Sequence, residues 1–249
     1  MFNRKNTIRW KTPGGGIWPL YQNMADQPHL LVAGATGSGK SVLLNGIIAT
    51  LIHDAPSANK LILIDPKRTE LFPYRNIPHT IAYAYEDDTI INALKYATHI
   101  MDTRLEQMRI AQTRTFHGAH IYVVSDELAD LLLRLKKQAK PLLQRLLQLG
   151  RCCSIHCLCA SQCVNATVIS TELKVNMSAI VGLRTATKAH SRLIVDIPGC
   201  ELFPDPQYEH KAYGYYRHGA NCELWELPYV KDSEINGLCR YWTSRECRA

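Results

Sequence analysis

The 249-residue sequence has no apolar run that approaches the roughly 18 residues of a membrane-spanning helix. Its first residues, MFNRKNTIRWKTP, lack the apolar centre of a secretory signal. Internal repeats and low-complexity tracts are missing as well. With 46% hydrophobic and only 20% charged residues, the composition is that of a folded protein with a sizeable core. We therefore expect a cytoplasmic protein of one large domain or two small ones.

The paired C-x-x-C knuckles of a zinc site are also missing, although the chain has nine cysteines. Five of them lie close together, at Cys152, Cys153, Cys157, Cys159 and Cys163. Without an export signal, reduced thiols are expected rather than a disulfide framework. Cys157 and Cys159 alternate within an apolar run, which favours packing in the core over metal binding.

Acidic residues are outnumbered, with 22 Asp and Glu against 29 Lys and Arg and a formal net charge of +7. This balance permits a polyanionic partner, although many proteins without one are comparably basic. One basic run, made of Arg134, Lys136, Lys137, Lys140 and Arg145, follows the acidic segment 126–130. The run is either a solvated helix face or a surface that binds anions, and its composition alone leaves both open.

Short apolar runs alternate with segments of helical spacing along most of the chain. The predicted buried strands are 30–33, 60–64, 121–124, 155–160 and 179–183. The predicted helices are 41–52, 89–110, 141–149 and 186–196, with Asp87 and Asp88 well placed to cap the second. Segments 213–217 and 222–227 are predicted to form a closing hairpin. The pattern indicates an α/β fold with a mostly parallel central sheet flanked by helices.

Three segments divide the chain. Residues 1–28, with Pro13-Gly14-Gly15-Gly16, are predicted to be a lead-in, 29–230 to be the main domain, and 231–249 to be a polar tail that frays or docks.

A phosphate-binding motif follows the first predicted strand. Gly34 to Ser41 satisfy G-x-x-x-x-G-K-[ST] and lead directly into an apolar helix. Glycines let backbone N–H groups turn toward phosphates, the helix N-terminus favours negative charge, and Lys40 would reach the terminal phosphates. The predicted ATP-binding residues are Gly34, Ala35, Thr36, Gly37, Ser38, Gly39, Lys40, Ser41 and Val42.

Two adjacent carboxylates, Asp126 and Glu127, end the predicted strand 121–124. This arrangement is a Walker B motif. Asp126 is predicted to hold Mg²⁺ together with Ser41, and Glu127 to orient and deprotonate the attacking water. An Asp-Glu pair alone is a weak signal, but here it follows a buried strand in a chain that already needs a magnesium carboxylate. The sequence therefore predicts an ATPase.

Several further segments closely resemble the motor domain of the FtsK/SpoIIIE family of DNA translocases. They are Pro28-His-Leu-Leu-Val-Ala-Gly34, Ile64-Asp65-Pro66-Lys67 with Glu70-Leu71, Ile77-Pro78-His79, Asp126-Glu127-Leu-Ala-Asp130-Leu131, Gly150-Arg151, Ile155-His156, Ala160-Ser161-Gln162 and Ser191-Arg192. The resemblance covers roughly residues 28 to 200. It implies a RecA-like P-loop NTPase that assembles as a ring, usually a homo-hexamer, around double-stranded DNA, with ATP between neighbouring subunits.

The resemblance also implies roles for single residues. Gln162 would sense the γ-phosphate, and Arg151 or Arg192 would reach a neighbour's nucleotide, with no basis in the sequence for choosing between the two arginines. The segment with Arg134, Lys136, Lys137 and Lys140 would face the DNA channel and bind phosphates without distinguishing bases. Asp65, Lys67 and Glu70 belong to the family signature, and either structural pairing or a catalytic role would explain them.

Departures from the family pattern suggest a divergent, minimal member. The usual Gln-Arg-Pro is replaced by Gln162-Cys163-Val164, and neither a membrane-spanning segment nor a winged-helix domain is recognised. A membrane-bound or loading partner supplied by another chain is therefore expected. A nucleotide-dependent adaptor of a conjugation or packaging complex and a small-molecule phosphotransferase remain the alternatives. Conjugation, packaging, plasmid maintenance and segregation all stay open.

Overall fold

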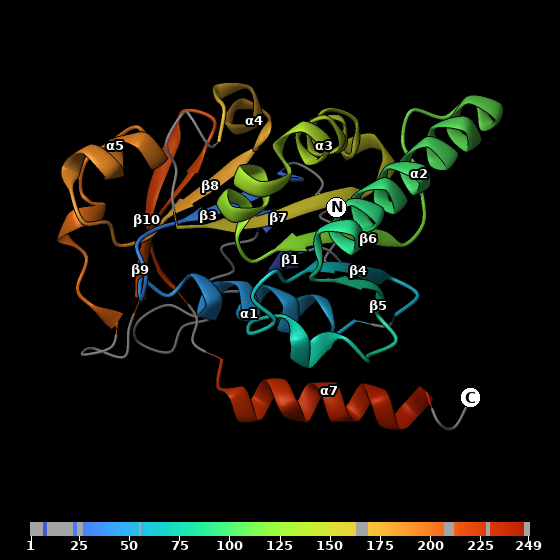
Figure 1. Cartoon of the computed structure of the whole chain (residues 1–249), viewed down its shortest axis with the longest axis horizontal. Coiled ribbons are helices and arrows are strands. Elements are labelled where there is room, and N and C mark those ends of the chain that lie inside the picture. The colour runs from blue at the N-terminus through green and yellow to red at the C-terminus, as the bar shows by residue number, and fades with distance from the viewer. Residues whose placement is uncertain are drawn as a thin grey trace.

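The computed structural model describes residues 7–8, 22–23, 27–54, 56–162, 169–206, 212–227 and 230–246. Its centre is an eight-stranded sheet with helices on both faces (Figure 1). From edge to edge the strands are β10 (Asn221–Leu227), β9 (Ala212–His218), β8 (Ala179–Gly182), β3 (Leu30–Ala33), β7 (Ile155–Ser161), β6 (His120–Ser125), β4 (Asn59–Ile64) and β5 (Thr80–Ala84). The pairs from β8 to β5 are parallel, and β8–β9 and β9–β10 are antiparallel. This order confirms the predicted α/β class with its C-terminal hairpin.

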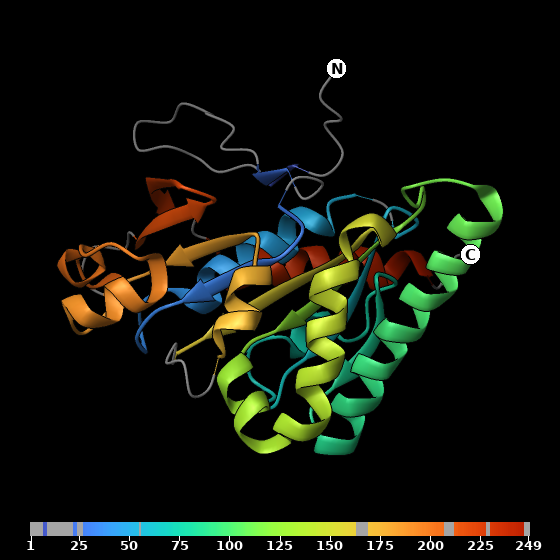
Figure 2. The ribbon, with the colours of Figure 1, turned by 90° about the horizontal axis from the view of Figure 1, so that it is seen from above.

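The helices form one layer on each face of the sheet. The first layer contains α2 (Asp87–Ala111), α3 (Leu128–Leu149), α4 (Thr171–Asn176) and α5 (Lys188–Val195), which contribute to one hydrophobic core. The second contains α1 (Lys40–Leu51), the 3₁₀ turn η2 (Phe72–Tyr74) and α7 (Asp232–Glu246), which contribute to the other core. Figure 2 shows α2 and α3 side by side over the sheet. In the described ranges, no helix combines the length and apolarity needed to cross a bilayer.

The central strands are apolar on both faces because both faces are covered. The β3 sequence LLVA is fully buried, and all seven β7 residues, from Ile155 to Ser161, are at most 2% exposed. Strands buried on both faces carry continuous apolar runs rather than alternating ones. Two more strands, β1 (Thr7–Ile8) and β2 (Gln22–Asn23), pair antiparallel in a separate small sheet within the segment predicted to be a lead-in.

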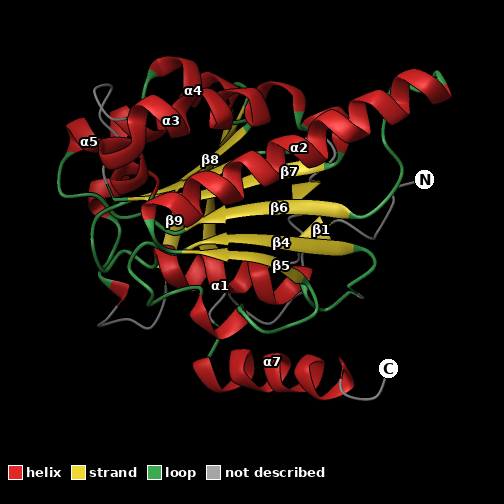
Figure 3. Cartoon of the chain, turned by 45° about the vertical axis from the view of Figure 1, so that its right-hand side comes forward, coloured by secondary structure: helices red, strands yellow, loops and turns green. Residues whose placement is uncertain are grey.

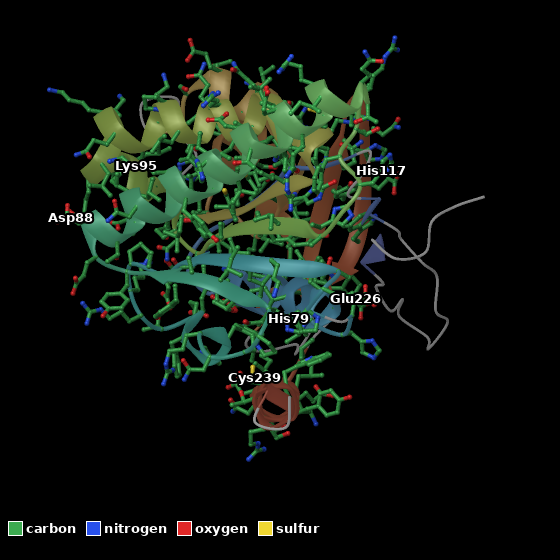
Figure 4. All side chains as sticks on the ribbon, turned by 90° about the vertical axis from the view of Figure 1, so that its right-hand side faces the viewer. His79, Asp88, Lys95, His117, Glu226 and Cys239 are labelled. Atoms are coloured by element: carbon green, nitrogen blue, oxygen red, sulfur yellow. The ribbon has the colours of Figure 1, made fainter. Side chains whose placement is uncertain are left out.

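The tail segment forms a helix that packs on the domain. The Trp242 indole N–H donates to the Ile52 carbonyl at 2.7 Å, and the Trp242 ring meets His79 edge-on, with centroids 4.8 Å apart. Figure 3 shows α7 beneath α1, and Figure 4 shows Cys239 on the side of α7 that faces His79. Ile235 and Cys239, on the same helix, are also buried against the domain.

Some boundaries differ from the sequence predictions. The helix predicted to start at residue 141 begins at Leu128, directly after Glu127, and contains Pro141 beyond a break at Leu135. The cap of α2 is Glu86, which forms a reciprocal capping box with Thr89. Strand β5 and the short helix α4 were not predicted at all.

Candidate nucleotide site

The loop between β3 and α1 has the backbone geometry that its glycines permit. Gly37 and Gly39 adopt φ values of 74° and 94°, in the left-handed region that costs glycine nothing. A Cβ on Gly34 would lie 2.6 Å from the Ser38 hydroxyl oxygen and 2.8 Å from Leu183 Cβ. Glycine is therefore required at these positions for the loop to turn tightly at the end of β3.

Main-chain hydrogen bonds fix this loop to the two neighbouring strands. The Gly34 N–H donates to the Ser161 carbonyl at 3.3 Å, and the Ala35 N–H donates to the Arg184 carbonyl at 2.8 Å. The tip at Thr36 and Gly37 is exposed, and Ser41 and Val42 are partly buried in the first turn of α1.

The Lys40 side chain folds back over the loop. Its ammonium donates to the carbonyl oxygens of Gly34 and Ala35 at 2.8 and 2.7 Å. Burial lowers the pKa of Lys40 to about 8, while the negative charge of Glu127 opposes that shift. A cation held only by carbonyls beside an open loop is well placed to exchange them for an anionic ligand.

The two acids lie at the carboxyl end of β6, next to β7 in the sheet. The Asp126 N–H donates to the Ile64 carbonyl at 3.4 Å, but the buried Asp126 Oδ1 has no hydrogen-bond partner among the described residues. Burial, and then the nearby Asp65, raise the pKa of Asp126 to about 7. A buried carboxylate oxygen without a donor is costly unless a ligand supplies positive charge.

Glu127, in contrast, is fully engaged. Its Oε2 lies 3.3 Å from the Lys67 ammonium, and its Oε1 accepts the Gln162 N–H at 3.1 Å and the Ser161 hydroxyl at 3.4 Å. The Ser161 carbonyl in turn accepts the Gly34 N–H. The acid pair and the phosphate-binding loop are therefore joined through the end of β7.

Gln162 is brought to the same place. Its side-chain oxygen accepts the Thr36 hydroxyl at 3.1 Å, which connects the loop tip to the residue that follows β7. Cys163 and Val164, where the family pattern is broken, lie outside the described residues.

The signature Asp65, Lys67 and Glu70 lies on the loop after β4. Buried Asp65 accepts the main-chain N–H groups of Thr69 and Leu71 at 3.3 and 3.0 Å and the Tyr83 hydroxyl at 3.2 Å. Asp65 thus orders the loop, and Lys67 is aimed at the acid pair. The contact of Lys67 with Glu127 is the feature of this site that sequence reasoning missed.

The two arginines predicted to act in trans are not placed alike. Arg151 is exposed in η3 (Arg151–Cys153), immediately before β7, so the length of that strand, roughly 20 Å, separates it from the loop in its own chain. Arg192 is exposed on α5.

The basic run lies on α3, and three of its five charged side chains are already paired. Arg134 forms ion pairs with Asp130 and Asp87, and Lys140 pairs with Glu172 at 3.0 Å. Arg145 pairs with Asp102. Lys136 and Lys137 are exposed, and no ion pair of theirs is found among the described residues. The positive charge available to a partner is therefore smaller than the sequence suggests.

The residues present fit a magnesium nucleotide. The loop lies at the N-terminus of α1, Lys40 is held by exchangeable contacts, and Asp126 Oδ1 and the Ser38 hydroxyl oxygen are buried without partners among the described residues. Within the described ranges, no three His, Cys, Asp or Glu side chains converge as metal ligands. The predicted ligands Asp126 and Ser41, one carboxylate and one hydroxyl, suit Mg²⁺, which takes its other ligands from phosphates and water. Cys157 and Cys159 are buried in β7.

The fold and this loop define a RecA-like P-loop NTPase, and two solved structures share the fold. The pCW3 conjugation coupling protein TcpA, determined with ATPγS, gives a TM-score of 0.81 over 96% of this chain and 71% of its own, at 21% identity. The cytoplasmic domain of the type VII secretion ATPase EccC from Thermomonospora curvata gives 0.76 over 97% of this chain and 32% of its own, at 22% identity. At these identities the likeness concerns the fold alone.

Sequence comparison identifies the family. Residues 14–123 match the FtsK/SpoIIIE family. The DNA translocase SftA of Bacillus subtilis is 35% identical over 199 residues, or 74% of this chain and 21% of SftA. The DNA translocase FtsK of Treponema pallidum is 31% identical over 251 residues, or 87% of this chain and 31% of that protein. The chain belongs to the FtsK/SpoIIIE family, although it spans less than a third of the length of these relatives.

Proposed function

We propose that this chain is the motor domain of an ATP-hydrolysing translocase of double-stranded DNA. The observation that carries the proposal is the joining of three elements at the carboxyl ends of the central strands. The loop of Lys40, the acids Asp126 and Glu127, and Gln162 all meet at the end of β7. Its relatives SftA and FtsK are named DNA translocases.

The residues divide the work of hydrolysis. The Gly34 and Ala35 amides hold the loop in place, and the later amides of the loop, up to Ser41, would bind the phosphates of ATP. Lys40 would exchange its two carbonyl contacts for the terminal phosphates. Ser41 and Asp126 would hold Mg²⁺, which supplies positive charge to the phosphoryl group. Glu127 would orient a water molecule and accept its proton, and Gln162 would change partner from Thr36 to the γ-phosphate.

Assembly would complete the site. In a homo-hexameric ring, Arg151 or Arg192 of one subunit would reach the nucleotide of its neighbour, a contact worth about 10³ to 10⁵ in rate where it operates. Arg151 supports this idea because its position before β7 removes it from the nucleotide loop of its own chain. Mass photometry with ATP and DNA tests the ring, and loss of DNA-stimulated turnover in Arg151→Ala or Arg192→Ala tests the assignment.

Side chains on α3 would bind the DNA phosphates without recognising bases. Lys136 and Lys137 would contact phosphates directly, and Arg134 and Lys140 would have to exchange carboxylate partners for phosphates. Binding should then weaken steeply with salt, as expected when lysines displace counterions.

The central test is ATP turnover with and without duplex DNA at low salt. We expect stimulation by DNA, and we expect Glu127→Gln to bind ATP while turning over about 100-fold more slowly. Lys40→Ala should lose nucleotide binding or turnover. Glu106→Gln, an exposed glutamate paired with Arg109 on α2, is the matched control and should behave as wild type. Near-normal turnover by Glu127→Gln would remove its assigned role.

The effect of duplex DNA on ATP turnover distinguishes a DNA translocase from the alternative functions. EccC, which shares the fold, is a secretion ATPase, so a polypeptide cargo is the main competitor to DNA. Turnover without any response to DNA would favour that cargo. Binding of ATP without turnover would favour a nucleotide-dependent adaptor.

A further inference from the structure

The loop that carries Lys67 is anchored independently of the acid it contacts. Asp65 ties this loop to itself and to β5, through the main-chain N–H groups of Thr69 and Leu71 and the Tyr83 hydroxyl. Glu127, on the other side of the pair, is the residue that directly precedes α3. The ion pair therefore bridges two structural units, the loop after β4 and the N-terminus of α3.

The two partners differ in freedom. The Lys67 side chain is 46% exposed, whereas that of Glu127 is 6% exposed. Glu127 Oε1 is fixed by the main-chain N–H of Gln162 and by the Ser161 hydroxyl, so Oε2 is the oxygen left to serve a water molecule. The Lys67 ammonium lies on that oxygen.

We propose that Lys67 is a positioning residue that holds Glu127 in a resting arrangement, and that this contact must break before hydrolysis proceeds at its full rate. An ammonium on Oε2 competes with the water for the carboxylate lone pairs, so the water is not held for attack while the contact persists. This inference rests on the proposed function, in which Glu127 activates water.

The position of α3 gives DNA a route to this contact. Lys136 and Lys137 follow Glu127 by about two and a half helical turns, directly after the break in α3 at Leu135. A force that DNA phosphates exert on these lysines acts at the break and through it on the first part of α3, which Glu127 precedes, whereas Lys67 stays with the loop ordered by Asp65. Separation of the pair then couples DNA contact to water activation.

The test compares Lys67→Gln, Lys67→Arg and Lys95→Gln with wild type in kcat and KM for ATP, with and without duplex DNA. Lys95 is an exposed lysine on α2 and serves as the matched control (Figure 4). We expect Lys67→Gln to raise the DNA-independent kcat about threefold, the scale of a partly exposed ion pair, with KM and the stimulated kcat unchanged. Lys67→Arg should keep the wild-type ratio of stimulated to basal rate.

An equal fall of basal and stimulated rates in Lys67→Gln, or an unchanged ratio, would overturn the proposal. A second readout needs no turnover. In the nucleotide-free protein, acetylation of Lys67 by an N-hydroxysuccinimide ester, followed by mass spectrometry, should be faster in Glu127→Gln than in wild type, with Lys95 unchanged. Equal acetylation of Lys67 in both proteins would mean that the pair does not form. Absence of any DNA response in wild type would instead count against the proposed function, and the acetylation result would still stand.

Discussion

The two ends of the central sheet treat a buried charge in opposite ways. At the amino end, the guanidinium of Arg104 donates to the carbonyls of Cys153 and Ala119 at 2.7 Å each and to that of Ser154 at 3.3 Å. At the carboxyl end, Asp126 is similarly buried, yet its Oδ1 has no donor among the described residues. The fold itself supplies hydrogen-bond acceptors for the Arg104 charge, whereas Asp126 Oδ1 would need a partner from a ligand.

Titratable groups confirm that the interior disfavours charge at both ends. Burial, followed by the neighbouring His120, holds the pKa of His156 well below its ordinary value. Burial raises the pKa of Asp126 to about 7. Arginine cannot lose its proton, so Arg104 needs its carbonyls, whereas Asp126 can be neutralised by a proton or compensated by a cation. An incompletely satisfied acid at a strand end is therefore the stronger indication of a ligand site.

The largest effect is expected from removing the satisfied charge. Arg104→Met removes the guanidinium donor from the Cys153 and Ala119 carbonyls, whereas the Ser154 carbonyl still accepts the Ile121 N–H, and it loses the stacking of the guanidinium on Phe116. We expect the free energy of unfolding to fall by about 4 kcal/mol, measured by chemical denaturation. Arg109→Met, on the same helix, loses only an exposed pair with Glu106 and should change it by about 0.5 kcal/mol or less. Similar losses in both variants would contradict the assigned role of Arg104.

At the carboxyl end of the sheet, removing the buried charge is expected to raise the free energy of unfolding rather than lower it. The folded-state pKa of Asp126 is about 7, whereas its ordinary value is 3.8. Above pH 7, the charged carboxylate therefore lowers the free energy of unfolding. Asp126→Asn removes that cost, so without magnesium and nucleotide the variant should be more stable than wild type by about 2 kcal/mol at pH 8.

Acidification provides the internal control for Asp126→Asn. Between pH 7 and pH 4 the folded wild-type protein binds more protons at Asp126 than the unfolded chain does, so the stability difference between the two proteins should shrink as the pH falls. Buried histidines titrate identically in both proteins and cancel from this difference. A variant that is less stable at pH 8, or a difference independent of pH, would show that Asp126 is satisfied in the apo protein.

The comparison also explains which parts of the molecule were predictable. The loop at Gly34 to Ser41 and the acids at Asp126 and Glu127 depend on local spacing beside apolar strands, and the structure brings these two segments together. The Lys67 and Arg104 contacts join residues about 60 and 49 positions apart, and no periodicity encodes such a pairing. Sequence reasoning placed Lys67 in a signature but could not identify its partner.

Missed helices have local causes. The first half of α3 follows Glu127, which makes no side-chain cap, so the usual start signal is absent, and Pro141 suggested a start that is in fact internal. The buried stripe of α7 consists of Ile235, Cys239 and Trp242, spaced by four and three residues. That spacing is helical and was available in the sequence, but a polar composition concealed it.

The smallest expected effects come from removing one serine hydroxyl at each end of the central sheet, and these two substitutions are the most closely matched. The Ser154 hydroxyl donates to the Phe116 carbonyl at 3.1 Å, whereas the buried Ser38 hydroxyl has no partner among the described residues. Ser154→Ala should lower the free energy of unfolding of the nucleotide-free protein by about 1 kcal/mol, because it removes a formed bond. Ser38→Ala removes an unsatisfied polar atom and should leave that free energy equal or higher by about 0.5 kcal/mol. If both substitutions destabilise equally in chemical denaturation, the two ends of the sheet do not differ in how they satisfy polar groups, and unsatisfied atoms at the carboxyl end no longer mark it as the ligand site.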